Sequence, residues 1–144
     1  MFVLAFMTVV SLHTAPSPAL QLAALQRVVP FRLLVLPASA QLLRAEANRV
    51  ADADVGARIE YSIEGPVVEI DERLPTEADA LANSAPHGQL YNIDGYPAVV
   101  NEAEAGYRHL TSLTWYRPDL TVTISSRDNR VSAPLLLDAA LELR

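Results

Sequence analysis

The feature that most constrains the fold is the alternation of apolar and polar residues in short segments joined by turns. Between residues 55 and 125, apolar side chains recur at every second position, as at Ile59 and Tyr61. A period of two is typical of strands with one buried face. Turn signals such as Asp94-Gly95 separate the segments. Because connections this short cannot carry a crossover, the strands are expected to pair antiparallel.

Helical patterns are predicted at both ends of this run. Residues 18–29 carry one apolar face that Pro30 ends, and Ser132 is a candidate N-cap for a helix that reaches Leu143. Residues 38–53 fit either a helix or a loop that runs into a strand. The sequence therefore predicts an α+β domain with an antiparallel sheet of about six strands and an N-terminal and a C-terminal helix packed on one face. We expect the strands at 55–64, 67–72, 90–93, 98–101, 108–117 and 120–125, with a separate buried strand at 31–36.

The N-terminal residues resemble an export signal. The run 1–12 is apolar except for Thr8 and Ser11, and small residues at Ser17 and Ala19 have the spacing that a signal peptidase recognises. We therefore expect a signal or membrane-tethering segment at 1–19, a single domain at 20–144, and an extracytoplasmic location in the periplasm or cell envelope. No basic residue precedes the apolar run, and a buried strand is the alternative interpretation.

Composition excludes several kinds of chemistry. The chain has no cysteine, which excludes disulfides, thiolate metal sites and cysteine nucleophiles. All 11 basic residues are arginine, so Schiff-base chemistry and a phosphate-loop lysine are excluded as well. The net charge of -6 and the lack of a basic stripe argue against nucleic acid as a partner.

No histidine or glycine pattern indicates a catalytic or metal site. His13, His87 and His109 are too far apart in the sequence to form a metal-binding motif. The five glycines do not cluster into a phosphate loop, and no Gly-x-Ser-x-Gly elbow is present. We expect neither a metal nor a cofactor.

Three acidic groups allow two interpretations. Two pairs of acids, Asp52 with Asp54 and Glu102 with Glu104, are best interpreted as solvent-exposed turns. Weak calcium binding is the alternative interpretation of these pairs. The run 69–72 contains three acids, one of which could serve a glycosidase, but that chemistry needs a second carboxylate at a defined separation. The chain is therefore expected not to be an enzyme.

Aromatic residues gather in the second half of the chain and form the candidate binding surface. Core packing is the competing interpretation, and we favour it for the tryptophan, which we expect beneath the C-terminal helix. Exposure is plausible for the tyrosine at the Asp94-Gly95 turn. The candidate residues are Tyr91, Tyr96, Tyr107, Trp115 and Tyr116.

Three short motifs carry a family resemblance. Residues 29–37 begin with Val-Pro-Phe and end with a proline, residues 93–98 form a Gly-containing hairpin, and residues 113–116 read Leu-Thr-Trp-Tyr. Together they resemble a bacterial extracytoplasmic domain family of unknown function that lies at the C-terminal end of anti-sigma-factor-like regulators. That family is similar to the lipoprotein-carrier fold, and the resemblance, over residues 26–144, implies binding or sensing rather than catalysis.

Two functions follow as hypotheses. The first is a non-enzymatic extracytoplasmic sensing or ligand-binding domain for a lipid-like ligand or a protein partner, in which a lipid would need an apolar cleft between sheet and helix. The second is an accessory subunit of a protein complex that retains and buries the apolar run 1–12.

Overall fold

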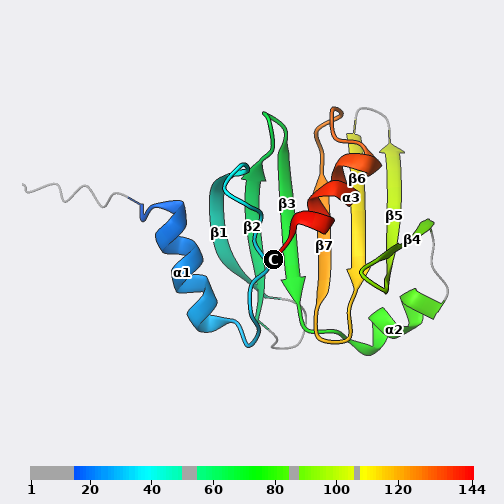
Figure 1. Cartoon of the computed structure of the whole chain (residues 1–144), viewed down its shortest axis with the longest axis horizontal. Helices are drawn as coiled ribbons and strands as arrows, with labels where there is room; N and C mark the ends of the chain where they lie inside the picture. Colours follow the sequence, from blue (N-terminus) through cyan, green and yellow to red (C-terminus); the bar gives the residue numbers. More distant parts are fainter. Residues whose placement is uncertain (1–14, 50–54, 85–87, 106–107) are drawn as a thin grey trace, which may run out of the picture.

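The computed structural model describes residues 15–49, 55–84, 88–105 and 108–144, and its centre is one open antiparallel sheet (Figure 1). Seven strands lie in the order β1-β2-β3-β7-β6-β5-β4. The first three strands and the last four each form a meander, and β3 joins them by pairing with β7. The strands are β1 (Gln41–Arg49), β2 (Val55–Ser62), β3 (Val67–Arg73), β4 (Gln89–Ile93), β5 (Tyr96–Ala105), β6 (Arg108–Tyr116) and β7 (Thr121–Ser126).

Three helices accompany the sheet. In Figure 1, α1 lies beside β1, α3 crosses β6 and β7, and α2 lies at the lower end of the sheet. None of the helices in the described ranges has the length and apolarity needed to cross a bilayer. The helices are α1 (Pro18–Val28), α2 (Glu77–Ser84) and α3 (Ala133–Glu142).

The predicted fold class is confirmed, and the strand count is seven instead of about six. The additional strand is β1, in the segment whose pattern fitted either a helix or a loop that runs into a strand. A shift in register between Leu42 and Arg44 interrupts its alternation, which explains the ambiguous pattern because a bulge moves the following side chains to the other face.

The predicted strand at 31–36 is wrong. This segment has no place in the sheet order. It crosses the covered side, where Val35 and Arg144 exchange two backbone hydrogen bonds of 3.0 and 3.2 Å. The apolar run in its sequence reflects burial against the core, because Leu33 and Leu36 are both buried.

One face of the sheet forms the core. Register places alternate residues of every strand on this face, and both terminal helices contribute to the same apolar cluster, for example through Leu25 and Leu136. In one row across the sheet, Glu72 lies between Ala57 and Val122. An acidic side chain is therefore built into the apolar face.

The opposite face carries polar side chains over the central strands. On it, Arg58 donates to Asp71 at 3.0 Å and lies 3.4 Å from a carboxylate oxygen of Glu69. The hydroxyls of Thr114 and Thr123 lie 3.3 Å apart on neighbouring strands. These residues explain the polar half of the alternation in β2, β3, β6 and β7.

The helix starts agree closely with the sequence patterns. Ser17 caps α1 by accepting the N–H of Leu20 at 3.5 Å, so cleavage after Ala19 would remove this cap and the first turn of the helix. Ser132 takes the N-cap position of α3, but its side chain makes no capping hydrogen bond.

Candidate functional site

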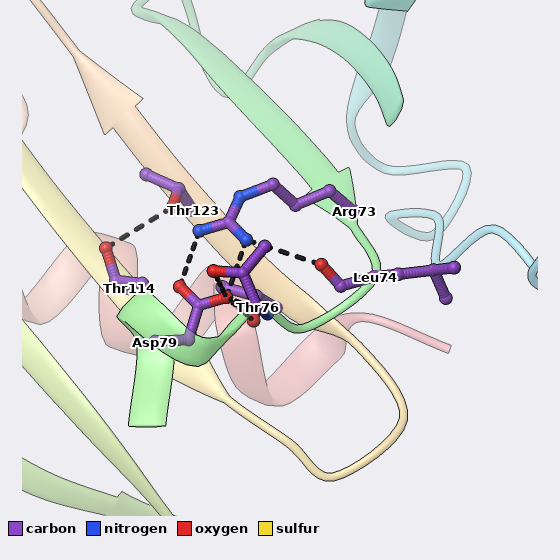
Figure 2. Close-up of polar contacts among 7 residues, drawn as sticks. Arg73, Leu74, Thr76, Asp79, Thr114 and Thr123 are labelled. Atoms are coloured by element: carbon purple, nitrogen blue, oxygen red, sulfur yellow. Dashed lines mark hydrogen bonds and ion pairs between the residues drawn. The ribbon is translucent and has the colours of Figure 1, made fainter. Parts of the chain in front are cut away.

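The most developed polar cluster lies at the α2 end of the sheet, where β3 ends and α2 begins. Figure 2 shows Arg73 reaching from the end of β3 to the carboxylate of Asp79 on α2. The pair is bidentate, with Nη1 to Oδ2 at 2.6 Å and Nη2 to Oδ1 at 2.5 Å. Asp79 is only 8% exposed, so this ion pair is largely withdrawn from water.

Three further donors hold the same carboxylate. Thr76 donates its backbone N–H at 2.7 Å and its hydroxyl at 3.0 Å to Oδ2 of Asp79. Thr121, on β7, donates its hydroxyl at 3.2 Å. Thr-x-x-Asp is a capping-box pattern, in which the side chain of Asp79 accepts the backbone N–H of Thr76. This bond fixes the start of α2.

This network sets the charge state of the acid. Burial alone would raise the pKa of Asp79, but the bonds from Arg73 and Thr76 outweigh it and lower the pKa to about 2. Burial, together with the nearby Asp79 charge, raises the pKa of Tyr116. The acid therefore remains ionised and the phenol protonated at neutral pH.

A hollow of about 310 Å³ opens beside this cluster. We call it the tyrosine hollow, because Tyr96 and Tyr116 line it together with Pro75, Pro97 and Pro118. Tyr96 is 38% exposed and Tyr116 is half-buried. Two of the five predicted aromatic residues thus meet at one site.

A second hollow, of about 410 Å³, lies on the other side of the β6–β7 turn. We call it the arginine hollow, because Arg32, Arg117 and Arg144 line it over Phe31, Leu34 and Leu120. Arg117 lines both hollows. The turn that carries it therefore contributes to both hollows.

The other predicted aromatic residues do not join the tyrosine hollow. Trp115 is 2% exposed in the core on the α3 side of the sheet, as the packing interpretation expected. Tyr91 is half-buried and packs against the same core. Tyr107 lies outside the described residues.

The remaining acids and histidines do not gather into a metal site. Among the residues that the structure describes, no group of three or more histidine, aspartate or glutamate side chains could hold a metal ion. Nε2 of His109 lies 2.7 Å from the hydroxyl of Thr111. His13, His87, Asp52 and Asp54 fall outside the described ranges, as does the side chain of Glu104, while Glu102 is exposed.

The acidic run 69–72 divides across the sheet. Glu69 and Asp71 lie with Arg58 on the face opposite the core, whereas Glu72 is 1% exposed in the core. Burial raises the pKa of Glu72 to about 8, against the opposing effects of the Leu34 N–H, which donates to Oε2 at 3.0 Å, and of Arg117. Its Oε1 has no hydrogen-bond partner among the described residues.

Two of these features were missed from the sequence, although signals for both were present. Glu72 follows Val68 and Ile70 at the same two-residue spacing, which assigns it to the apolar face. The capping box of Thr76 and Asp79 marks the start of α2. The ion pair with Arg73 had no such signal, because it depends on how the chain turns after β3.

Comparison of the chain with protein-family models, with curated proteins and with solved structures finds no match. The family resemblance of residues 26–144 stays a prediction.

Proposed function

We propose that this chain is a non-enzymatic binding or sensing domain that holds a short, extended segment of a protein partner in the tyrosine hollow, and that it works outside the cytoplasm. The observation that carries the proposal is the meeting of Tyr96 and Tyr116, from two different strands, in one hollow with rigid walls.

The composition of the hollow suits a peptide. Tyrosine rings offer a large apolar surface and a polar hydroxyl, a combination enriched at protein interfaces. Pro75, Pro97 and Pro118 restrict the backbone around the rings. Aromatic-lined grooves of this kind bind extended, proline-containing segments.

The charges nearby favour an uncharged segment. Asp79, which lines the hollow, is neutralised by its ion pair with Arg73, and Arg117 is paired with Asp119 through two bonds of 3.1 Å. A charged peptide would therefore find no unpaired partner among these four groups.

The same network argues for binding instead of catalysis. A general base works best with a pKa near the operating pH, and the pKa of Asp79 is about 2. Both of its oxygens are already occupied by donors. Glu72 has a pKa closer to neutral, but at 1% exposure it does not meet a substrate.

Peptide selection tests the proposal directly. A library of random peptides displayed on phage would be selected on the immobilised full chain. The selected peptides would then be synthesised, and their affinities would be measured by fluorescence polarisation. We expect uncharged, proline-containing peptides whose affinity falls about tenfold or more in Tyr96→Ser and in Tyr116→Ser.

Leu90→Ser supplies the matched control, because Leu90 is an exposed apolar side chain on β4 that does not line the hollow. Its affinity should equal that of the unmodified chain, and circular dichroism should show all three variants folded. Peptides that bind all variants equally would contradict the proposed site.

The location outside the cytoplasm rests on residues 1–19, of which 1–14 lie outside the described ranges. Sequencing the N-terminus of protein recovered from its native cells tests it. Processing near residue 19 is expected, whereas an intact N-terminus would favour the accessory-subunit alternative.

A further inference from the structure

We propose that the arginine hollow is a separate binding site for a small organic anion, in which a carboxylate or phosphate is attached to an apolar group. The ligand's charged end would meet the guanidinium groups at the rim, and its apolar end would lie on the floor of the hollow.

The charge at this hollow is opposite to that of the whole chain. Three of the 11 arginines line it, namely Arg32, Arg117 and Arg144, against a single side-chain carboxylate, Asp119, in a chain of net charge -6. Asp119 is paired with Arg117, so Arg32 and Arg144 supply the excess of positive side-chain charge at the rim. An anion is the ligand that this excess favours.

The guanidinium groups have donors to spare. Within the part of the chain that the structure describes, Arg32 makes neither an ion pair nor a hydrogen bond through its side chain. Arg144 uses Nη1 to donate to the carbonyl of Leu143 at 3.0 Å. Because a guanidinium has five N–H donors in a planar fork, both side chains can still form the bidentate bonds that carboxylates and phosphates accept.

The third arginine is held in place. Two bonds of 3.1 Å join Arg117 to Asp119, and its guanidinium carbon lies 5.1 Å from the ring centroid of Trp115. Arg117 is therefore fixed with its charge paired to Asp119, and the exposed side chains of Arg32 and Arg144 are the groups left to bind an anion beside it.

The floor of the hollow is apolar. Phe31, Leu34 and Leu120 line it, and its volume of about 410 Å³ is within the range of small-molecule sites. Leu34 also donates its N–H to the buried Glu72, whose pKa of about 8 keeps it largely protonated at neutral pH. The acid below the floor therefore does not cancel the positive rim.

Titration calorimetry of the full chain tests the site with defined probes. Decanoate and decyl phosphate combine both features of the proposed ligand. Butyrate shortens the apolar part, inorganic phosphate lacks it, and decyltrimethylammonium reverses the charge. Saturable binding is expected for the first two, and much weaker binding for the others.

The double variant Arg32→Gln/Arg144→Gln locates the site. It should bind decanoate about tenfold more weakly, since it loses charge-assisted hydrogen bonds at the rim. Arg127→Gln is the matched control, because Arg127 is an exposed arginine just beyond the opposite end of β7. Both variants replace exposed side chains, so their melting temperatures should stay close to that of the unmodified chain.

Each other outcome overturns the proposal. If decyltrimethylammonium binds as tightly as decanoate, the arginine charges do not select the ligand. If inorganic phosphate or butyrate binds as tightly as decanoate, the apolar floor does not contribute to binding. Unchanged affinity in the double variant would place the ligand elsewhere. Tighter competition by a glutamate-rich peptide would assign the hollow to a protein partner.

A vesicle arm distinguishes the source of the anion. The chain would be floated with phosphatidylglycerol vesicles. If it floats with them, and if the double variant or added decanoate abolishes this flotation, the ligand is the headgroup of a membrane lipid. Decanoate binding without flotation would identify a free organic anion.

Discussion

Glu72 on β3 and Asp79 on α2 are both withdrawn from water, yet their pKa values move in opposite directions. Glu72 accepts one hydrogen bond, from the N–H of Leu34, and its second oxygen has no partner among the described residues. Burial therefore dominates and raises its pKa to about 8.

Asp79 shows the other result of burial. Five hydrogen bonds reach its two oxygens, from Arg73, Thr76 and Thr121. Although burial opposes ionisation, the bonds from Arg73 and Thr76 lower the pKa to about 2. The donors around a carboxylate, and not its exposure alone, therefore decide its charge.

The largest expected effect is the pH dependence due to Glu72. Its pKa is about 8 in the folded protein and about 4.3 in an unfolded chain, so the folded state retains the proton to higher pH. The resulting stabilisation is complete below about pH 4 and is lost as the pH rises through 8, which amounts to about 5 kcal/mol.

Urea unfolding at pH 5 and pH 8 measures this dependence. Glu72→Gln should remove most of the loss of stability at the higher pH, because the amide cannot ionise. Glu142→Gln, at an exposed position on α3, should leave the dependence as it is. Identical pH slopes in the two variants would show that Glu72 is not the group responsible.

The next effect comes from removing the cation beside Asp79. Arg73→Met leaves a buried carboxylate without its ion pair, and we expect a loss of about 3 kcal/mol in unfolding free energy at pH 7. The double variant with Asp79→Asn should lose less than the sum of the single changes. A loss below about 1 kcal/mol in Arg73→Met would mean that the threonine donors suffice.

The smallest effect removes one neutral donor. Thr121→Val deletes the 3.2 Å bond to Asp79 and should cost about 1 kcal/mol. Thr123→Val is its control, since the Thr123 hydroxyl bonds to the hydroxyl of Thr114 and not to Asp79 (Figure 2). Equal losses in both variants would argue against a special role for the Asp79 cluster.

Much of the fold could be predicted from the sequence, because strict alternation survives in most strands. The hairpin at Asp94-Gly95 was predicted from its turn residues, and both residues have the positive φ that such a turn requires. The bulge in β1 hid a strand, and the buried segment 31–36 resembled one. In both cases the pattern of apolar residues indicated which side chains are buried, but it did not indicate whether the backbone pairs with a neighbouring strand.

The candidate site could be predicted only in part. Aromatic content indicated Tyr96 and Tyr116 and placed Trp115 in the core, but it did not indicate the prolines that line the hollow with the two tyrosines. The arginine hollow gathers Arg32, Arg117 and Arg144 from three distant segments. No local sequence pattern predicts that these three arginines lie together, because their proximity depends on the order of the strands and on the path of segment 31–36 across the covered face of the sheet.

The most direct test of the proposed function is an NMR titration of the full chain with a selected peptide, followed through the tyrosine ring resonances. The account predicts that Tyr96 and Tyr116 shift with the peptide, while Tyr91, packed on the core side, does not. Shifts confined to Tyr91, or no shift at either residue of the tyrosine hollow, would contradict it.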